Sequence, residues 1–409
     1  MRAVREVNGG AASTPRSVGS SFPISTPPGV GPSGPKHLIM RMNVLLAALA
    51  STALLVGAPS LRAQAHDASR YWVYVANESS DVVSVVRFDG HQAVEETAIP
   101  VGYHPTDIDG AHGVSVSPDG EYLYVSLAHG QPYGRILKMR TGTNQVVDSM
   151  TAGLFPSSMA LTPDGSTLFA SNFNLHGDPV PSMVSAVFTP LMAQVERIET
   201  CVRPHGSRVS HDGANHYSGC LLSDQLVEIS TQSLAVTRRM SLTAEHEGLT
   251  EQGPSSVVDG AEACRPSWVV LSPDDRWLYV TCNGRGEVLE IERETLWIKR
   301  RFATGLGPYN ADITPDGSRL LVTLKGEQAL AVIDLKTGAQ LRLQTSRPVT
   351  HGVVVSPDGR YAFVSNEAVG ATRGTVDVID LATTRIVATA EVQFQAGGIA
   401  FWKSESSAP

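Results

Sequence analysis

A short motif recurs along this chain and constrains its fold more than any other feature. Each copy is an apolar segment, then Ser or Thr followed in most copies by Pro-Asp-Gly, then a second apolar segment. In such a turn Pro presets φ, Asp caps the turn and Gly supplies a positive φ, so each copy predicts a β-hairpin. The copies begin at Ser117, Thr162, Ser210, Ser272, Thr314 and Ser356.

The spacing of the hairpins predicts how they assemble. Successive copies start 45, 48, 62, 42 and 42 residues apart. Two further short strands fit after each hairpin, for example 287–293 and 295–301. Four short strands in a repeat of about 40–50 residues are typical of a β-propeller.

The two ends of the chain complete one more unit than the six motifs provide. Segments 71–77, 81–88 and 93–101 have the character of second, third and fourth strands, and 397–402 supplies the missing inner strand. The sequence therefore predicts an all-β, seven-bladed β-propeller with four-stranded blades. Pairing the N- and C-terminal strands closes the ring and removes exposed sheet edges.

Four strings carry a resemblance to a known family. They are YLYVS (122–126), WLYVTCN (277–283), YAFVSNE (361–367) and YWVYVANE (71–78). In the frame of the SPDG hairpins they resemble the YVTN/SPDG-repeat propellers, which include surface-layer proteins. The haem domain of nitrite reductase, the lactonase-type propellers and the amine-dehydrogenase propellers look similar. The resemblance covers about 70–403 and implies a WD40-like architecture, but its repeated residues are turn and core residues, so it implies little about function.

The N-terminal part has the character of a leader. Residues 1–39, rich in Gly, Ser, Pro and Thr, are expected to be a disordered or non-native extension. Residues 40–65 combine Arg41, an apolar run over 44–58 and an Ala-Gln-Ala site, as a secretory signal peptide does, with a cut after Ala65. The run is short for a spanning helix, although an uncleaved anchor is the alternative. We therefore expect residues 66–409 to be a periplasmic or extracellular propeller without a membrane span.

Charge narrows the classes of partner. The formal net charge is −8 and the pI is about 5.8. Nucleic acids and anionic membrane surfaces both favour a basic excess, so neither is an expected partner. The sequence favours a monomer that binds a small-molecule ligand or another exported protein.

The four cysteines occupy matching positions in the repeat. Cys220 and Cys282 each end a second strand, and Cys201 and Cys264 each stand just before an inner strand. Because first and second strands are antiparallel, these positions meet at the top of one blade. An even cysteine count in an exported chain favours disulfides, so we predict Cys201–Cys220 and Cys264–Cys282. A redox or metal-thiolate role is the alternative.

One column of the repeat is rich in histidine. Five residues before the Ser or Thr anchors stand His112, Ser157, His205, Ser267, Tyr309 and His351, with Gly397 or Gly398 in the seventh blade. This position should open each inner strand at the mouth of the channel. Three imidazoles on the first, third and sixth blades are spaced nearly evenly, which predicts a trigonal site for copper, iron, zinc or a haem-like cofactor. A polar funnel without metal is the alternative. His104 and His129, expected on the same face, are further candidate ligands.

Arginine also recurs at the rim. Arg203, Arg265 and Arg347 each precede a Pro that opens an inner strand. With Tyr309 they could bind a carboxylate or phosphate ligand, because guanidinium groups bind both in a bidentate manner. The alternative is a set of inter-blade salt bridges with Asp107, Glu262 or Glu367. The insertion over 241–263 could be a lid, a partner contact or an ordinary long loop.

Three functions remain open at this point, and the sequence does not decide whether the chain is an enzyme. The first is an exported binding module that acts through its top face and central channel. The second is a metal- or haem-dependent oxidoreductase, or a maturation protein for one, with channel histidines as ligands. The third is a lactonase or lyase of the propeller type. The sequence contains no C-x-x-C-H, G-x-S-x-G, H-E-x-x-H or P-loop motif.

Overall fold

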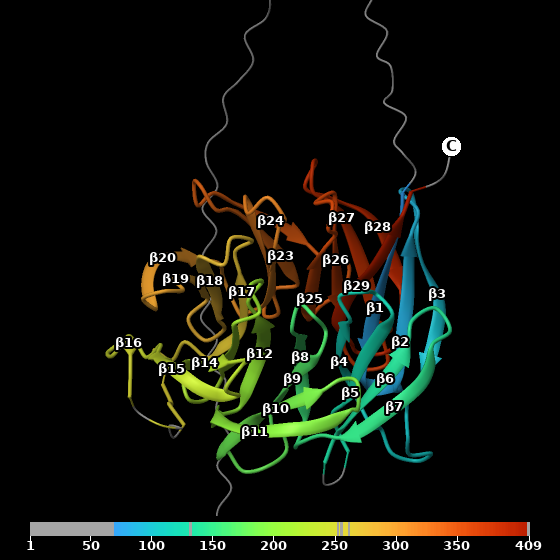
Figure 1. Cartoon of the computed structure of the whole chain (residues 1–409). Coiled ribbons are helices and arrows are strands. Elements are labelled where there is room, and N and C mark those ends of the chain that lie inside the picture. Colours follow the sequence, from blue (N-terminus) through green and yellow to red (C-terminus); the bar gives the residue numbers. More distant parts are fainter. Residues whose placement is uncertain (1–68, 131–132, 252, 254–256, 261, 407–409) are drawn as a thin grey trace, which may run out of the picture. The chain divides into compact units, whose positions relative to one another are not determined.

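The structure, a computed structural model, describes residues 69–406 apart from 131–132, 252, 254–256 and 261. The proposed extension over 1–39 and signal peptide over 40–65 lie outside the described residues. In the described part, seven antiparallel sheets stand around a central channel (Figure 1). The described residues include no helix that is long and apolar enough to cross a membrane.

Each sheet is one blade, and the blades follow chain order. Blade 1 comprises β4 (Ala111–Val116), β5 (Tyr122–Leu127), β6 (Arg135–Arg140) and β7 (Gln145–Thr151). Blade 2 comprises β8 (Pro156–Leu161), β9 (Thr167–Asn172), β10 (Pro181–Phe188) and β11 (Ala193–Val202). Blade 3 comprises β12 (Pro204–Val209), β13 (Asn215–Cys220), β14 (Gln225–Ser230), β15 (Ala235–Ser241) and β16 (Gly248–Leu249).

The other half of the ring repeats the same plan. Blade 4 comprises β17 (Pro266–Leu271), β18 (Trp277–Cys282), β19 (Glu287–Glu292) and β20 (Trp297–Ala303). Blade 5 comprises β21 (Pro308–Ile313), β22 (Arg319–Leu324), β23 (Ala329–Asp334) and β24 (Gln340–Gln344). Blade 6 comprises β25 (Thr350–Val355), β26 (Tyr361–Asn366), β27 (Thr375–Asp380) and β28 (Arg385–Glu391). Blade 7 comprises β29 (Ala396–Glu405), β1 (Arg70–Asn77), β2 (Val82–Phe88) and β3 (Ala93–Pro100), and the short 3₁₀ helix η1 (Glu78–Ser80) follows β1.

The two ends of the described chain meet in blade 7, as the sequence predicts. Strand β29 pairs antiparallel with β1, so that Phe401 lies opposite Val73 and Ala400 opposite Tyr74. Figure 1 shows the red β29 beside the blue β1. Each inner strand neighbours the inner strands of the adjacent blades, from β29 through β4, β8, β12, β17, β21 and β25 back to β29. The seven-bladed ring closed by its termini is therefore confirmed.

The SPDG turns hold their hairpins by side-chain hydrogen bonds. In blade 1, Ser117 Oγ donates to Asp119 Oδ1 over 2.5 Å and accepts from the N–H of Tyr122 over 2.9 Å. Gly120 has φ +74°. In blade 4 the fourth turn residue is Asp275, at φ +57°, and its carboxylate accepts from the N–H of Asp212 over 2.8 Å. This contact joins the turns of blades 3 and 4.

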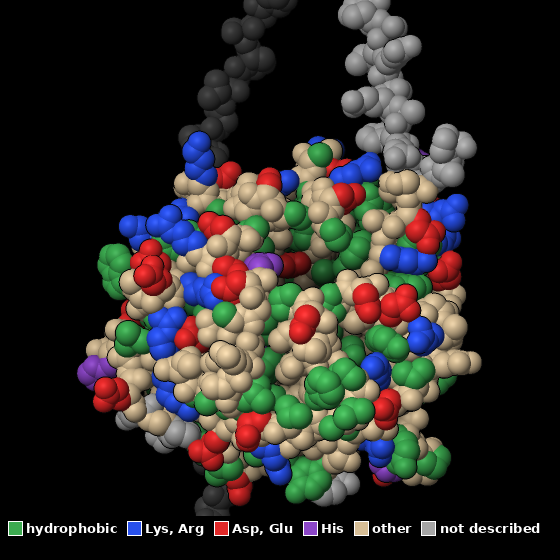
Figure 2. Space-filling view, in the orientation of Figure 1, with side chains coloured by type: hydrophobic (Ala, Val, Ile, Leu, Met, Phe, Trp, Pro, Cys, Tyr) green, Lys and Arg blue, Asp and Glu red, His purple; other side chains and the backbone are tan. Residues whose placement is uncertain are grey.

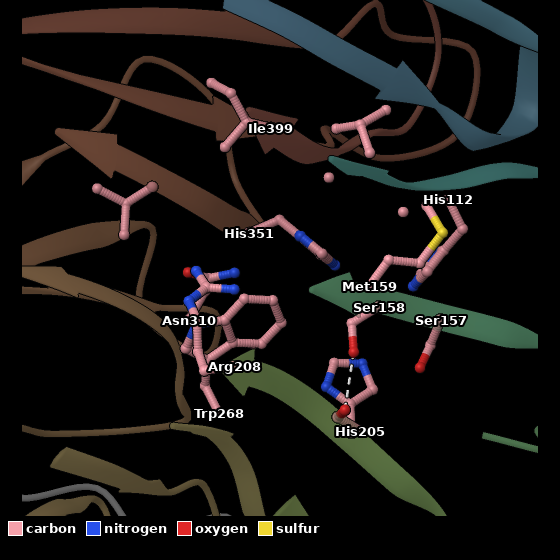
Figure 3. Close-up of a pocket in the computed structure, with 14 residues that line it drawn as sticks. His112, Ser157, Ser158, Met159, His205, Arg208, Trp268, Asn310, His351 and Ile399 are labelled. Carbon is pink, nitrogen blue, oxygen red and sulfur yellow. Dashed lines mark hydrogen bonds between the residues drawn. The ribbon is translucent and has the colours of Figure 1, made fainter. Parts of the chain in front are cut away.

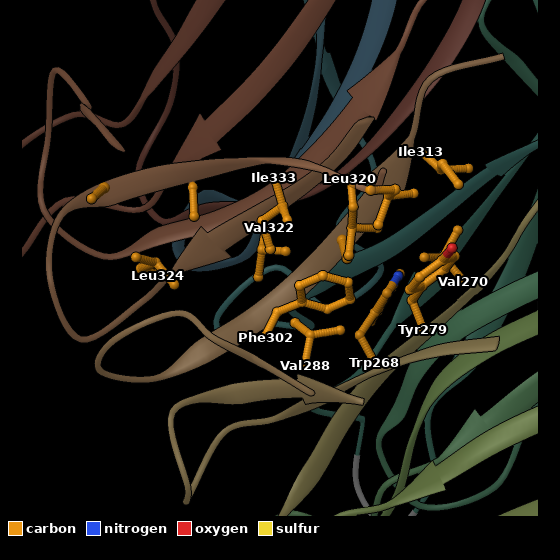
Figure 4. Packing of buried hydrophobic residues seen from close by; sticks show 14 residues of the cluster. Trp268, Val270, Tyr279, Val288, Phe302, Ile313, Leu320, Val322, Leu324 and Ile333 are labelled. Atoms are coloured by element: carbon orange, nitrogen blue, oxygen red, sulfur yellow. The ribbon is translucent and has the colours of Figure 1, made fainter. Parts of the chain in front are cut away.

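The core lies between adjacent blades, because each sheet packs both faces against its neighbours. The cluster between blades 4 and 5 shows the pattern (Figure 4). Phe302 and Trp268 from blade 4 pack with Leu320 and Ile333 from blade 5. A blade therefore has no core of its own, and its stability depends on the completed ring.

Both predicted disulfides are present, so all four cysteines are paired. Cys201 in β11 bonds Cys220 at the end of β13, so this bond joins blade 2 to blade 3 and does not lie within one blade as expected. Cys264 bonds Cys282 at the end of β18, within blade 4. The shared register of the repeat is the reason that the pairing could be predicted.

We expect the variant Cys201→Ser/Cys220→Ser to lose about 3 kcal/mol of unfolding free energy, since a cross-link restricts the unfolded chain. Guanidinium denaturation of the oxidised protein measures the loss. The variant Cys264→Ser/Cys282→Ser is the matched comparison: the separations are 19 and 18 residues, so the losses should be equal. A double variant as stable as the wild type would contradict the prediction.

The insertion over 241–263 begins with a short strand at the edge of the ring. Strand β16 adds a fifth strand to the outer edge of blade 3, and Figure 1 shows it at the periphery of the ring. Glu247, just before it, forms ion pairs with Arg285, at 3.2 Å, and with Arg301, both in blade 4. Glu247 and β16 therefore brace two blades, while Val258 N–H, later in the insertion, donates to Leu222 O over 2.7 Å.

Candidate functional site

The second residue of every inner strand stands at the mouth of the central channel. The members of this column are His112, Ser157, His205, Ser267, Tyr309, His351 and Gly397. In blade 7 the strand begins at Ala396, so Gly397, and not Gly398, occupies this position. Figure 2 shows a hollow in the middle of this face, with histidine and acidic side chains at it.

The column histidines line one cavity together, and Tyr309 stands between His351 and His205. The ring centroids of His112 and His351 are 5.9 Å apart, those of His351 and Tyr309 are 4.7 Å apart, and those of Tyr309 and His205 are 5.3 Å apart. Gly397 lies between His112 and His351 in the ring of blades. A Cβ at Gly397 would lie 3.7 Å from His351 Cε1, which is an ordinary van der Waals contact.

This arrangement gives no support to the predicted trigonal metal site of His112, His205 and His351. Both ring nitrogens of His205 are engaged, Nδ1 with Ser267 O over 2.8 Å and Nε2 with the Tyr309 hydroxyl over 3.0 Å. Among residues 69–406 as described, no group of three or more His, Cys, Asp or Glu side chains could hold a metal ion. Of the three imidazoles, His205 is the one whose two nitrogens are both hydrogen-bonded within the described structure.

Glu78 is the centre of a hydrogen-bonded chain at the mouth. Its Oε2 lies 2.9 Å from His112 Nδ1, and its Oε1 lies 2.6 Å from His129 Nε2. Gln395 Nε2 donates to Oε2 over 3.0 Å, and His129 Nδ1 lies 2.9 Å from Nε2 of the exposed His176. The chain therefore runs from the buried mouth to the surface.

The electrostatics of this chain keep Glu78 ionised. Burial alone would raise the pKa of Glu78, but the His112 and His129 rings hold it well below its usual range. A carboxylate bonded to Nδ1 fixes the orientation of an imidazole and leaves its Nε2 available as a base. No described residue hydrogen-bonds His112 Nε2, so this atom is the candidate base of the site.

A second charged group lies beside Tyr309 and His351. Lys325 Nζ lies 2.6 Å from Glu367 Oε1 and 4.4 Å from the centroid of the Tyr309 ring. Burial alone would lower the pKa of Lys325. Tyr309 and Glu367 together outweigh this effect, so the pKa of Lys325 is raised and its ammonium group stays charged. His351 Nε2 is 3.7 Å from Glu367 Oε1. Burial, with Lys325 next in importance, lowers the pKa of His351 well below its usual value, so this ring is neutral.

Sequence reasoning missed Glu78, Lys325 and Glu367, which share one structural position. The residues that directly follow the second strands are Glu78, Ala128, Phe173, Leu221, Asn283, Lys325 and Glu367. A signal for them existed, because YWVYVANE and YAFVSNE both end in Asn-Glu at this position. Aligning the second strands, and not only the anchors, would have found the two acids.

The channel is narrow at the column itself. Its cavity has a volume of about 50 Å³ and is lined by His112, His205 and His351 together with Met159, Trp268 and Asn310 (Figure 3). Ligand pockets for drug-sized molecules have about 300–1,000 Å³, so only ions or a few waters fit within. A larger ligand would therefore bind at the mouth.

The remaining candidates have structural partners of their own. His104 Nδ1 lies 2.6 Å from Asp109 Oδ1, in an exposed loop. Arg203 donates to Leu175 O over 3.1 Å, and its guanidinium lies 5.6 Å from the centroid of the Phe173 ring.

The predicted salt bridges of the rim arginines are wrong in their partners. Arg347 has its ion pair with Glu391, at 4.0 Å, while Glu367 pairs with Lys325. No ion pair of Arg203 or Arg265 exists among the described residues. The partners differ because Glu367 lies at the mouth, where it forms its ion pair with Lys325.

Acid should destabilise the protein through His205. Burial lowers the pKa of His205 to about 3, whereas an unfolded His titrates near 6.5. The unfolded state therefore binds more protons between these values, so stability is complete above about pH 6.5 and falls as the pH drops. We expect a loss of about 3 kcal/mol from this group by about pH 4.5.

Thermal unfolding of His205→Gln should depend less on pH than that of the wild type. The control His91→Gln, in an exposed turn, should keep the wild-type dependence, and equal slopes in all three proteins would refute the assignment.

Comparisons with known proteins agree on the fold. The model of the family described as lactonase, 7-bladed β-propeller, matches residues 22–180. The periplasmic gluconolactonase PpgL of Pseudomonas aeruginosa has a TM-score of 0.62 at 18% identity, over 82% of this chain and 99% of that one. The chain is a seven-bladed β-propeller.

Two more solved structures share the propeller fold. A candidate 6-phosphogluconolactonase from Bacteroides fragilis has a TM-score of 0.61 at 14% identity, over 81% of this chain and 98% of that one. Hydrazine synthase of Kuenenia stuttgartiensis has a TM-score of 0.54 at 19% identity, over 68% of this chain and 80% of that one. No curated protein matches the propeller by sequence. Identities this low establish the fold alone, and the resemblance to the YVTN/SPDG group stays a prediction.

Proposed function

We propose that this propeller hydrolyses a small lactone at the mouth of its channel. The observation that carries the proposal is the Glu78–His112 pair, with a carboxylate on Nδ1 and an unengaged Nε2 at the mouth. The gluconolactonase among its structural neighbours and the partial match to the lactonase model support the same reading. The binding-module reading then describes the first step of this function.

The chemistry needs one base, one acid and stabilisation of negative charge. His112 Nε2 takes a proton from water as the water oxygen attacks the lactone carbonyl carbon. The C–O bond of the ring ester then breaks, and the imidazolium returns the proton to the departing ring oxygen. Glu78 stabilises the imidazolium in between. Lys325 supplies the positive charge at the mouth that favours the developing oxyanion.

The shape of the mouth favours a compact, ring-shaped substrate. Phe155 is buried and packs edge-on against the candidate base, with its ring centroid 5.2 Å from that of His112 and 5.1 Å from that of His129. The narrow channel has no room for a sugar ring, so such a substrate stays at the mouth. A sugar lactone fits this limit, and the two disulfides support a protein that meets its substrate outside the cytoplasm.

The test is turnover of a panel of sugar lactones by the full chain, purified from an exporting host and treated with a chelator. Glucono-1,5-lactone and galactono-1,4-lactone are the first substrates, and acid release is followed in weak buffer. We expect hydrolysis well above the spontaneous rate. Folded protein that accelerates no lactone would overturn the proposal. Binding of a lactone without turnover, seen by calorimetry, would leave only the binding module.

A further inference from the structure

One wall of the channel carries polar atoms without partners. Trp268 Nε1, Asn310 Oδ1 and His351 Nδ1 have no hydrogen-bond partner among the described residues. Their residues are only 8%, 5% and 5% exposed, and all three line the same cavity of about 50 Å³. An unsatisfied buried polar atom costs about 1–3 kcal/mol, so three in one cavity indicate a ligand or water that completes them.

A guanidinium lies in the same cavity. Arg208, in β12, stacks over the Trp268 ring at 4.7 Å and donates one hydrogen bond, from Nη1 to Ser207 O over 3.0 Å. A guanidinium has five N–H donors. Figure 3 shows Arg208, Trp268 and Asn310 gathered on one side of the cavity, with His112 on the other.

The charge of Arg208 has no direct counter-ion in the described structure. No described carboxylate lies within 4.0 Å of its guanidinium. Asp312 is the nearby acid, but its oxygens accept from the N–H groups of Val355, over 2.8 Å, and Ile313, over 3.0 Å. Burial raises the pKa of Asp312, whereas the charge of Arg208 lowers it, so the two groups attract each other only at longer range. A partly buried cation whose acid is distant and engaged elsewhere favours an anion beside it.

We propose that this cavity binds one small monovalent anion of halide size, held by the Arg208 guanidinium, the Trp268 indole N–H and the Asn310 amide. The amide presents its N–H end to the anion after a half-turn about its last bond, which leaves its heavy-atom positions unchanged. His351 Nδ1–H is the fourth donor in the corresponding tautomer. The cavity volume restricts the ligand to a halide or an ion as small as formate. The site does not depend on the proposed lactone hydrolysis.

The experiment measures anion-specific stabilisation and location in the full chain. Thermal unfolding is followed in chloride, bromide, formate and sulfate at one ionic strength, and crystals soaked in bromide are examined for anomalous scattering. We expect a saturable rise of the melting temperature with bromide or chloride and not with sulfate, and a bromide peak beside Arg208. A response to formate alone assigns the site to small carboxylates.

Matched variants separate this site from surface effects. Arg208→Gln should abolish the anion response, whereas Arg276→Gln, which alters an exposed Arg stacked 4.8 Å from the Trp277 ring, should keep it. Should Arg208→Gln not fold, Trp268→Phe removes one N–H donor and should weaken halide binding about tenfold. No anion-specific response in the wild type, or full response in both Arg208→Gln and Trp268→Phe, would overturn the proposal and leave a water-filled cavity.

Discussion

Glu78→Gln is expected to lower kcat/KM for the lactone substrate by roughly 10²–10⁴-fold. An amide at this position cannot stabilise the His112 imidazolium, and its NH₂ end can face His112 Nδ1 and select the wrong tautomer. The same side chain also binds His129 and Gln395, so the loss reflects the whole hydrogen-bonded chain. Initial rates over a range of lactone concentrations measure the effect.

Three further variants separate catalysis from folding. His112→Gln should be as impaired as Glu78→Gln, and the double variant should be no worse, because groups that act as one unit are not additive. Glu96→Gln, whose carboxylate pairs with Arg87 on the surface, is the matched control and should keep wild-type rates. A Glu78→Gln protein with wild-type melting temperature and undiminished kcat/KM would exclude the assigned mechanism.

Removal of β29, by ending the chain at Gln395, should abolish cooperative folding. The deletion exposes the inner edge of β1 and removes Ile399 and Phe401, which pack against the cluster of Tyr71 and Phe363. It also removes the contacts of β29 with β4 and β25, which flank it in the ring. Since each blade relies on its neighbours for a core, the loss should spread beyond blade 7.

Circular dichroism during heating and limited proteolysis measure this outcome. A chain that ends at Glu405 keeps every described pairing of β29 and is the control, with the wild-type transition expected. A truncated chain that ends at Gln395 and still melts in one sharp transition near the wild-type temperature would show that ring closure is not needed for folding.

The features that sequence reasoning predicted are those encoded locally and repeated. The turn of Ser117 and Asp119 depends on residues within six positions of each other, so its chemistry is readable wherever the motif occurs. The disulfides followed because the period fixes the register. Cys201 and Cys264 then fall at matching positions, as do Cys220 and Cys282.

What could not be predicted depends on contacts between blades. The column of His112, His205 and His351 was located at the channel, but the partners of each imidazole could not be read from the sequence, and a metal role for the column stays a prediction. Glu78 reaches His112 from another blade, 34 residues away in the chain, and Tyr309 reaches His205 from 104 residues away. No repeat signal specifies such partners, since they are the residues that the repeat leaves free.

The most direct test of the account is a crystal structure of Glu78→Gln soaked with the lactone that the wild type turns over fastest. The impaired variant should hold the intact ring at the channel mouth, with its carbonyl carbon facing His112 Nε2 and its oxygen toward Lys325. A lactone bound in the outer groove of another blade, with the mouth empty, would contradict the claim that the mouth is the functional site.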